Sequence, residues 1–173
     1  MFKFKFDIIT LCETWLNDTI SDNEIGLDGY DLIRKDRNRS GGGVVMYIRN
    51  MISYKVRSDI MPDTLETITI EVAKYRAKPF FINTWYRAPN TPSEVFDKYE
   101  SGIKKLDSED KEIICIGDLN CNWPEPKKTE TQNLLQLTKL FQLEQMIEEP
   151  TRITETARTL IDLIFTNRGR SYK

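Results

Sequence analysis

The sequence predicts a single α+β domain in which β-sheets are flanked by helices. The chain has 173 residues, which is the size of one domain with a substantial core. Seven runs of residues suit strands and outnumber two helical segments, and the strands do not alternate strictly with helices as they would in a doubly wound fold. Two runs, 80–86 and 113–117, are almost continuously apolar. Such runs are typical of central strands covered on both faces.

The predicted strands are apolar or alternating runs that end in polar loop residues. They span residues 7–12, 29–35, 44–49, 66–73, 79–86, 112–118 and 159–166. In the fourth run, apolar residues at 68, 70 and 72 alternate with polar ones at 67, 69 and 71, which predicts one face in solvent. The triple glycine 41–43 is not followed by Lys-Ser or Lys-Thr, so it predicts a turn between strands rather than a Walker loop.

Two helices follow from capping residues and apolar spacing. The first is predicted to begin at Thr91, with Pro92 in the first helical position and Glu94 completing a Thr-x-x-Glu capping box. The second is predicted to open near Thr129 and to run to Phe141, with its leucines at helical spacing. No repeat or low-complexity tract interrupts the chain, so one continuous domain is expected.

The charge balance and the histidine count narrow the possible chemistry. There are 25 Lys and Arg against 27 Asp and Glu, and the net charge of −2 predicts no strong electrostatic field. No histidine occurs in the 173 residues. Serine triads, His-Glu-x-x-His metalloprotease helices and Cys₂His₂ zinc fingers are therefore excluded within this chain. Its chemistry must use carboxylates, amides, phenols, amines or thiols.

The cysteines and the lack of long apolar runs indicate a reducing, aqueous location. Cys12, Cys115 and Cys121 are odd in number, lie in or beside apolar runs and form no Cys-x-x-Cys pair. Buried reduced thiols are expected rather than disulfides, a zinc site or a nucleophile. No apolar run approaches the roughly 18 residues that a membrane span needs. An intracellular, soluble protein without a membrane partner is expected.

Four polar side chains follow or interrupt separate apolar runs: Glu13, Tyr86, Asp118 and Asp162. They are predicted to converge at one end of a sheet sandwich, where strands hold side chains firmly. Asn120 lies two residues after Asp118, so both would point to one side if the extended backbone continued. A carboxylate and an amide there suit a phosphate, and a second carboxylate suits Mg²⁺. Taken singly, each residue equally suits a turn, an exposed loop or an aromatic core position.

A short basic segment offers a second kind of site. Arg34, Lys35, Arg37 and Arg39 surround Asp36 and give a local charge of about +3. Such a segment can lie along a phosphate backbone, and it is equally explained as the solvated end of a strand.

In order along the chain, six segments form a more specific pattern. They are DIITLCETWL, GYDLIRKDRNRSGGGVVMYIR, NTWYRAPN, IICIGDLN, EPTRIT and RTLIDLIFTN. Together they resemble the endonuclease/exonuclease/phosphatase superfamily, within which the chain is most similar to the apurinic-type endonuclease domain of non-LTR retrotransposons. That domain stands before a reverse transcriptase in the parent polypeptide, and it cuts DNA. The resemblance covers nearly the whole chain.

The resemblance implies a sandwich of two mixed sheets with helices outside. It also implies that Glu13 is the principal ligand of Mg²⁺, with Mn²⁺ as the alternative ion. Asp118 would orient and deprotonate the attacking water, while Asn120 and Tyr86 would hydrogen-bond the scissile phosphate. Asp162 matches the aspartate that orients a catalytic histidine in the family.

Two further residues are implied as contacts of the substrate backbone, Asn90 in the YRAPN segment and Thr151 in EPTRIT. The family's closing Ser-Asp-His segment would lie beyond Lys173, and its first strand, which carries an Asn of the metal site, would lie before Met1. Residues 1–173 are therefore expected to form one domain truncated at both ends, with exposed apolar surface, unpaired sheet edges and greatly reduced activity.

Two rival functions stay open at this point. The chain can be a non-catalytic remnant that binds nucleic acid weakly through residues 34–39. Alternatively, the same fold can hydrolyse a small phosphomonoester or a lipid phosphodiester, because fold does not settle function.

Overall fold

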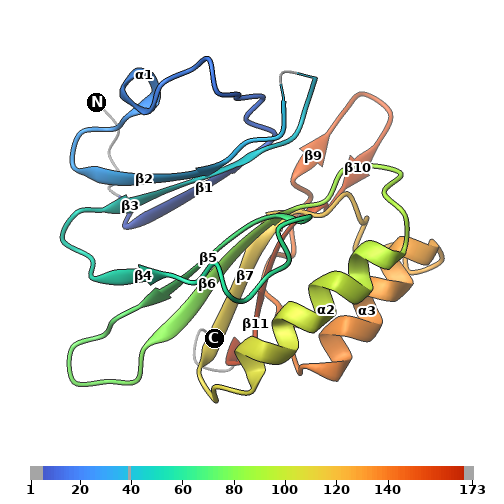
Figure 1. Cartoon of the computed structure of the whole chain (residues 1–173). Helices are drawn as coiled ribbons and strands as arrows, with labels where there is room; N and C mark the ends of the chain where they lie inside the picture. Colours follow the sequence, from blue (N-terminus) through green and yellow to red (C-terminus); the bar gives the residue numbers. More distant parts are fainter. Residues whose placement is uncertain (1–5, 39, 170–173) are drawn as a thin grey trace.

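The computed structural model describes residues 6–38 and 40–169. Two β-sheets and two long helices form three layers (Figure 1). The strands are β1 Ile8–Cys12, β2 Tyr30–Lys35, β3 Val44–Arg49, β4 Tyr54–Val56, β5 Glu66–Val72, β6 Phe80–Tyr86, β7 Glu112–Asp118, β8 Glu144–Gln145, β9 Arg152–Ile153, β10 Arg158–Thr159 and β11 Asp162–Thr166. The helices are α1 Asp22–Ile25, α2 Glu94–Asp107 and α3 Thr129–Leu140.

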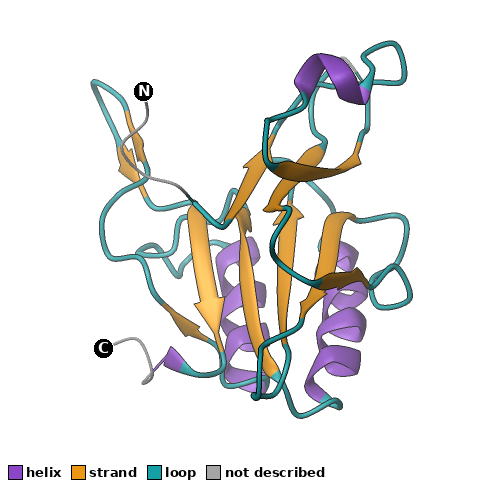
Figure 2. Cartoon of the chain, turned by 90° about the vertical axis from the view of Figure 1, so that its left-hand side faces the viewer, coloured by secondary structure: helices purple, strands orange, loops and turns teal. Residues whose placement is uncertain are grey.

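The sheets confirm the predicted α+β architecture. The smaller sheet has the order β1-β3-β2 and the larger has the order β4-β5-β6-β7-β11-β8, with β9 and β10 forming a separate two-stranded ribbon. All pairs are antiparallel except β6 and β7, which are parallel. The helices α2 and α3 cover the face of the larger sheet that is turned away from the smaller sheet (Figures 1 and 2). Within the described residues, no helix is long and apolar enough to cross a bilayer.

Two apolar cores hold the three layers together. One lies between the sheets and is built from alternate residues of β3, β5 and β6, among them Met46 and Ile70, both 0 % exposed. The other lies between the larger sheet and the two helices, where Trp85 stacks on Tyr99 with ring centroids 3.8 Å apart. The larger sheet is therefore buried on both faces along β6, as its continuous apolar run predicted.

The prediction of a solvent-facing side for residues 66–73 is wrong. Thr67 and Thr69 of β5 are buried at 6 % and 4 % exposure, because α2 covers this face. Asn83 on β6 donates to both threonine hydroxyls at 2.7 and 2.8 Å, and its own oxygen accepts a hydrogen bond from Tyr99 at 2.6 Å. Polar side chains alternate here because they form a buried hydrogen-bonded chain, not because they meet water.

Three predictions about individual elements need correction: the start of α2, the run 159–166 and the number of short elements. The helix α2 begins at Glu94 rather than at Thr91, and Ser93 occupies its N-cap position. The hydroxyl of Thr91 donates to the carbonyl of Ala88 at 2.6 Å, so the predicted capping box does not form. The run 159–166 is split, because residues 158–159 pair with β9 while β11 begins only at Asp162. The short elements α1, β4, β8, β9 and β10 were not predicted, since each has only two to four residues.

Part of the larger sheet lies beyond the cover of the smaller one. Ile114 and Ile116 of β7 and Ile164 of β11 are only partly buried, and a cavity of about 200 Å³ is lined by Ile114, Met146, Ile164 and Thr166. On the neighbouring edge strand β1, Leu11 is 46 % exposed. Apolar surface is thus exposed on this side of the described molecule.

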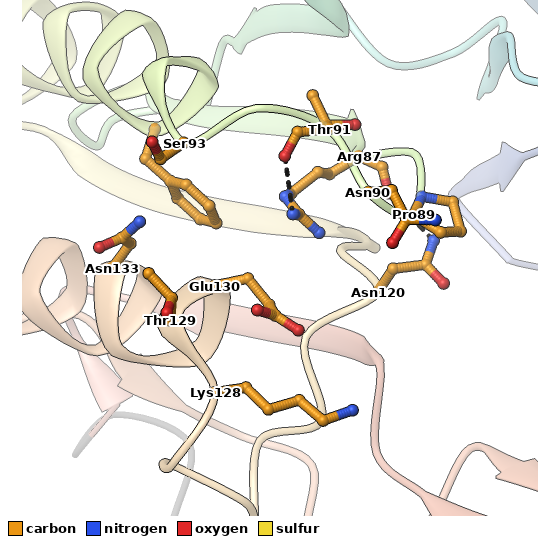
Figure 3. Close-up of a pocket in the computed structure, with 11 residues that line it drawn as sticks. Arg87, Pro89, Asn90, Thr91, Ser93, Asn120, Lys128, Thr129, Glu130 and Asn133 are labelled. Atoms are coloured by element: carbon orange, nitrogen blue, oxygen red, sulfur yellow. Dashed lines mark hydrogen bonds between the residues drawn. The ribbon is translucent and has the colours of Figure 1, made fainter.

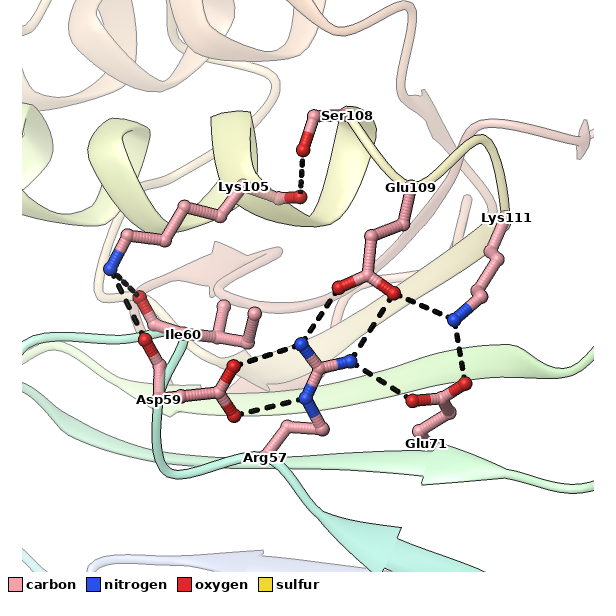
Figure 4. Close-up of polar contacts among 8 residues, drawn as sticks. All are labelled: Arg57, Asp59, Ile60, Glu71, Lys105, Ser108, Glu109 and Lys111. Atoms are coloured by element: carbon pink, nitrogen blue, oxygen red, sulfur yellow. Dashed lines mark hydrogen bonds and ion pairs between the residues drawn. The ribbon is translucent and has the colours of Figure 1, made fainter.

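A network of ion pairs connects the segment after α2 to the larger sheet (Figure 4). The guanidinium of Arg57 contacts Asp59, Glu71 and Glu109 at 2.7 to 2.9 Å. Lys111 contacts Glu71 and Glu109, each at 2.6 Å. Hydrogen bonds from Arg57 and then Lys111 lower the pKa of Glu109 to about 2.

This network predicts acid-sensitive stability. The folded-state pKa of Glu109 lies below its ordinary value, so its contribution is present above about pH 4.5 and is lost as the pH falls towards 2. We expect the Arg57→Met variant to lose about 2 kcal/mol of unfolding free energy at pH 7 and to show a flatter stability profile between pH 5 and 2. Urea unfolding across this pH range measures both effects.

Lys78→Met provides the matched control. Lys78 contacts only the exposed Asp110 at 2.7 Å, with side chains 65 % and 88 % exposed, so its replacement should cost almost nothing. Equal losses in the two variants would contradict the role assigned to the Arg57 network.

Candidate active site

The candidate site lies where four strand ends meet. Glu13 directly follows β1, Tyr86 ends β6, Asp118 ends β7 and Asp162 begins β11. Because β6 and β7 are parallel and β11 runs antiparallel to β7, the ends at Tyr86, Asp118 and Asp162 share one edge of the larger sheet, and Glu13 meets them from the end of β1 in the smaller sheet. Asp162 and Asp118 are register partners across β7 and β11. The structure therefore brings together four residues whose successive separations along the sequence are 73, 32 and 44 positions.

A cavity of about 430 Å³ opens at this edge. Glu13, Asp118, Thr151 and Asp162 all contribute to its lining. The hydroxyl of Thr151 accepts hydrogen bonds from the backbone N–H groups of Ile161 at 3.3 Å and of Asp162 at 3.1 Å. Thr151 thus fixes the start of β11 and lines the cavity with the acidic residues, while its contact with substrate stays a prediction.

Tyr86 and Glu13 are directly joined. The phenol of Tyr86 donates a hydrogen bond to Oε1 of Glu13 across the gap between the two sheets. Burial raises the pKa of Tyr86 well above its ordinary value, and the hydrogen bond and charge of Glu13 raise it further. Tyr86 is therefore a protonated donor at neutral pH, and Glu13, which directly follows β1, accepts its hydrogen bond.

Asp118 has the most perturbed carboxyl group of the site. Burial raises its pKa to about 6, the backbone N–H of Asn120 opposes the shift, and the negative charges of Asp162 and Glu13 raise it further. A carboxyl group with this pKa is ionised at pH 7 and holds a proton far more readily than an ordinary aspartate. Such a group is suited to accept a proton from water.

The prediction that the side chains of Asp118 and Asn120 point to one side, as in an extended strand, is wrong. Asn120 has a φ of +49°, so the extended backbone ends before it. Its backbone N–H donates to Oδ1 of Asp118 at 3.0 Å, and its side-chain nitrogen donates to the carbonyl of Arg87 at 3.0 Å. The side chain of Asn120 lines a second cavity, together with Asn90 (Figure 3). Asp118 lines the first cavity and Asn120 the second, and the Asn120 N–H bond to Asp118 joins the two residues.

Left-handed backbone conformations gather at the site. Glu13, Asn90 and Asn120 have φ values of +54°, +59° and +49°. Residues other than glycine adopt such values at a cost, and the surrounding structure must hold them. Three of the predicted site residues thus sit on turns whose geometry is imposed by the rest of the fold.

The triple-glycine turn holds the segment that carries Glu13, a role that sequence reasoning did not assign to it. All three glycines have positive φ, at 138°, 75° and 86°. The carbonyl of Gly42 accepts from the N–H of Trp15 at 3.0 Å, and the N–H of Gly43 donates to Glu66 at 2.5 Å. Arg37 then contacts Glu66 at 3.1 Å. The run of glycines was the only sequence signal for this clamp.

The basic segment 34–38 is occupied by internal contacts. Arg34 binds Asp36 and Asp22 as well as the carbonyls of Asn17 and Ile20. Lys35 lies 3.8 Å from Asp63, and Arg37 is paired with Glu66. Arg39, the remaining member of the predicted basic segment, lies outside the described residues. The described part of this segment is therefore structural rather than a free basic surface.

The thiols do not supply a nucleophile. All three cysteines are free, and Cys115 and Cys121 are buried. Burial raises the pKa of Cys12 to about 11, of Cys115 to about 11 and of Cys121 to about 12. Cys115 and Cys121 are thus buried free thiols as predicted, whereas Cys12 is only half-buried, and all three are protonated at neutral pH.

The donor set at this edge fits a hard divalent cation that is completed by other ligands. Among residues 6–38 and 40–169, no three Asp, Glu or Cys side chains form a ready-made metal cluster. Mg²⁺ does not require one, because it is commonly held by one or two carboxylates together with waters and substrate phosphates. Glu13, which lines the cavity, and Asp118 with Asp162, whose charge raises the pKa of Asp118, provide such oxygen ligands.

Comparison with known proteins gives one sequence family and several structural neighbours. A model of the Endonuclease/Exonuclease/phosphatase family matches residues 2–172. No curated protein sequence matches the chain. Among solved structures, the endonuclease domain of TRAS1, a telomere-specific non-LTR retrotransposon, superimposes with a TM-score of 0.72 at 14% identity, over 94% of this chain and 72% of that one.

Two further neighbours have the same fold. The catalytic domain of APE2 from Xenopus laevis gives a TM-score of 0.64 at 13% identity, over 94% of this chain and 74% of that one. The 3′ phosphatase NExo from Neisseria, solved with a product DNA hairpin, gives 0.59 at 14% identity, over 96% and 78%. At these identities the likeness establishes the fold, a sandwich of two sheets with helices outside.

Proposed function

The chain belongs to the endonuclease/exonuclease/phosphatase family, and we propose that it is a DNA-nicking phosphodiesterase of the kind that precedes the reverse transcriptase of a non-LTR retrotransposon. The observation that carries the proposal is the meeting of Tyr86, Asp118 and Asp162 of the larger sheet with Glu13 of the smaller sheet, with the pKa of Asp118 raised to about 6. The similarity to a retrotransposon endonuclease domain supports DNA as the substrate and a reverse transcriptase as the linked partner.

Asp118 acts on the attacking water. Its carboxylate accepts the proton as the water oxygen attacks phosphorus, and the N–H of Asn120 holds one carboxylate oxygen in place at 3.0 Å. Burial is the main cause of the raised pKa of Asp118, and the negative charge of Asp162 raises it further, which strengthens Asp118 as a base. Since the group is ionised at pH 7, no prior deprotonation is needed.

Tyr86 and Asn120 bind the phosphate. The Tyr86 phenol is protonated and donates, and in the free protein Glu13 accepts this hydrogen bond. The Asn120 amide nitrogen gives one hydrogen to the carbonyl of Arg87 and keeps a second for a phosphate oxygen. Donors aimed at the oxygens stabilise the charge that develops during the reaction. Thr151 and Asn90 are proposed to contact the substrate backbone on either side.

Glu13 is the proposed principal ligand of Mg²⁺, and Mn²⁺ is the alternative ion. A bound divalent cation supplies Lewis acidity at the phosphate and offsets the charge of the leaving oxygen. Glu13 would hold the cation, and in the free protein its Oε1 accepts the hydrogen bond of Tyr86. The clamp formed by the glycine turn holds the backbone segment that carries Glu13.

We further propose that hydrolysis by these 173 residues is slow. The sequence contains no histidine, so Asp162 has no imidazole to orient and no imidazolium stabilises the charged phosphate. A single catalytic group of this kind is commonly worth about 10²- to 10⁴-fold in rate.

Nicking of supercoiled plasmid by monodisperse protein tests the proposal. We expect slow conversion to the open circular form in Mg²⁺ and none in EDTA, because the carboxylates alone cannot neutralise the phosphate. Gel electrophoresis over several hours measures the rate.

Two results would replace the proposal by a rival. Folded protein that does not nick, yet binds DNA with a steep salt dependence that ignores EDTA, would favour a non-catalytic binder. Release of phosphate from a small phosphomonoester without plasmid nicking would favour a phosphatase, the activity named for the Neisseria neighbour.

A further inference from the structure

The ion pair between Arg37 and Glu66 lies next to the segment that carries Glu13, and no step of the proposed reaction uses it. Glu66 is the first residue of β5 and the register partner of Tyr86 on β6. Its Oε2 accepts a hydrogen bond from the N–H of Gly43 at 2.5 Å, and its Oε1 accepts one from Nη1 of Arg37 at 3.1 Å. One carboxylate therefore joins the paired strands β5 and β6 to the glycine turn.

The guanidinium of Arg37 holds the same turn at a second point. Its Nε donates to the carbonyl of Gly41 at 2.9 Å, so the guanidinium bridges the first glycine of the turn and Glu66. The guanidinium carbon lies 6.0 Å from the centroid of the Tyr86 ring, which is within the range of a cation–π contact. A Cβ atom at Gly42 would lie 2.5 Å from Nε of Arg37. The ion pair is thus packed directly against the turn.

The turn in its place holds the backbone that directly follows Glu13. The N–H groups of Thr14 and Trp15 donate to carbonyls of the turn at 3.4 and 3.0 Å. Glu13 and Trp15 have φ values of +54° and +56°, which residues with side chains adopt at a cost. Such conformations persist only where surrounding contacts hold them. Loss of the contacts that fix the turn is therefore expected to let the Glu13 segment relax.

We propose that Arg37 and Glu66 are positioning residues that hold the Glu13 carboxylate in the geometry that binds the divalent cation. The proposal rests on the proposed function, because it takes Glu13 as the ligand of that cation. The contacts run from Glu66 to the glycine turn, and from the turn to the backbone after Glu13. Removing a group that orients a metal ligand without touching the metal commonly lowers metal affinity by about 10- to 100-fold.

The sign of the change in cation affinity tests the proposal. Binding of Mn²⁺ to the metal-free chain is measured without DNA by electron paramagnetic resonance of the free ion. Removal of a positive charge near a cation site should, by charge alone, tighten binding. We expect Arg37→Met instead to weaken Mn²⁺ binding by about tenfold, because the loss of ligand geometry outweighs the loss of repulsion. Arg37→Lys keeps the charge but not the fork of donors, and it should weaken binding by a smaller factor.

The matched control is Lys35→Met, which removes a positive charge from the same segment. The ammonium of Lys35 lies 3.8 Å from the exposed Asp63, and among the described residues it forms no hydrogen bond to the glycine turn. Its removal should change the Mn²⁺ affinity by less than about twofold. Tighter binding in Arg37→Met, or equal weakening in Arg37→Met and Lys35→Met, would overturn the proposal.

Hydrogen exchange of the metal-free protein gives a readout that does not involve the cation. The N–H of Trp15 is bonded to the carbonyl of Gly42 at 3.0 Å. We expect this N–H to exchange faster in Arg37→Met than in the wild type, while the N–H groups between β5 and β6 keep their rates. Faster exchange of Trp15 with an unchanged Mn²⁺ affinity would show that the turn supports only the fold, and the positioning role would be overturned.

The outcomes separate this proposal from the proposed function. Plasmid nicking together with equal Mn²⁺ affinities of the wild type and Arg37→Met would overturn only the positioning role. Weaker Mn²⁺ binding in Arg37→Met but not in Lys35→Met, without any nicking by the wild type, would support the positioning role and overturn hydrolysis. A wild-type protein that does not bind Mn²⁺ at all would overturn both.

Discussion

Replacing Asp118 by Asn is expected to abolish plasmid nicking and at the same time to stabilise the fold. Asparagine has nearly the same shape and still accepts the hydrogen bond from the N–H of Asn120, but it cannot take a proton from water. Loss of the general base lowers the rate by about 10²- to 10⁴-fold, which takes an already slow reaction below detection. The plasmid assay with Mg²⁺ measures this loss.

The gain in stability follows from the pKa of Asp118. Burial and the charges of Asp162 and Glu13 raise the folded-state pKa to about 6, above the ordinary value of 3.8. A raised carboxyl pKa gives a stabilising contribution that is present below pH 3.8 and is lost as the pH rises through 6, so ionised Asp118 destabilises the fold at pH 7. Allowing for partial exposure, we expect Asp118→Asn to add about 1 to 2 kcal/mol at pH 7 and nothing at pH 3.

The same group sets the pH dependence of the wild-type rate. Nicking should rise with pH up to about 6 and level off above it, because the ionised carboxylate is the active form. Urea unfolding in EDTA at pH 3 and pH 7 provides the stability comparison. A variant that loses activity but is equally destabilised at both pH values would show that Asp118 acts through structure and not as a base.

The strand ends of the site could be predicted from the sequence because strand periodicity is a local property. Apolar runs stop at Glu13, Tyr86 and Asp118. The order of strands in the larger sheet brings Tyr86 and Asp118 to one edge, and the packing of the two sheets brings Glu13 to Tyr86. The conformation of Asn120 could not be predicted, since its left-handed φ depends on hydrogen bonds to Arg87 and Asp118 across the loop. Local patterns identified the residues, and distant contacts decided where the side chains point.

Burial imposed by distant elements explains the remaining errors. Thr67 and Thr69 resemble solvent-facing strand residues until α2 brings Tyr99 over Asn83, which bonds both. Arg87 likewise resembles an exposed residue after a strand, yet it lies beneath the first turns of α2 and α3 at 5 % exposure. A polar residue in a single sequence gives no indication of whether water or a buried partner satisfies it.

At Gly117, strand β7 lies against the backbone of Trp85 in strand β6. Replacing Gly117 by Ala is expected to be the most destabilising change in the chain. A Cβ atom at position 117 would lie 1.9 Å from the carbonyl oxygen of Trp85 and 2.9 Å from its carbonyl carbon. Both are backbone atoms of β6, so no side-chain rotation relieves the clash, and the strands must separate. We expect a loss of about 3 kcal/mol or more, measured by urea unfolding.

Strand separation would also damage the site, because Tyr86 and Asp118 directly follow the two residues in contact. Nicking should therefore fall even at temperatures where Gly117→Ala remains folded, which separates a positioning effect from simple unfolding. Gly26→Ala is the matched control: its added Cβ lies 3.3 Å from the nearest carbonyl oxygen, so stability should change by less than about 0.5 kcal/mol. If both glycines tolerate alanine equally, the β6–β7 spacing does not define the geometry of the active site.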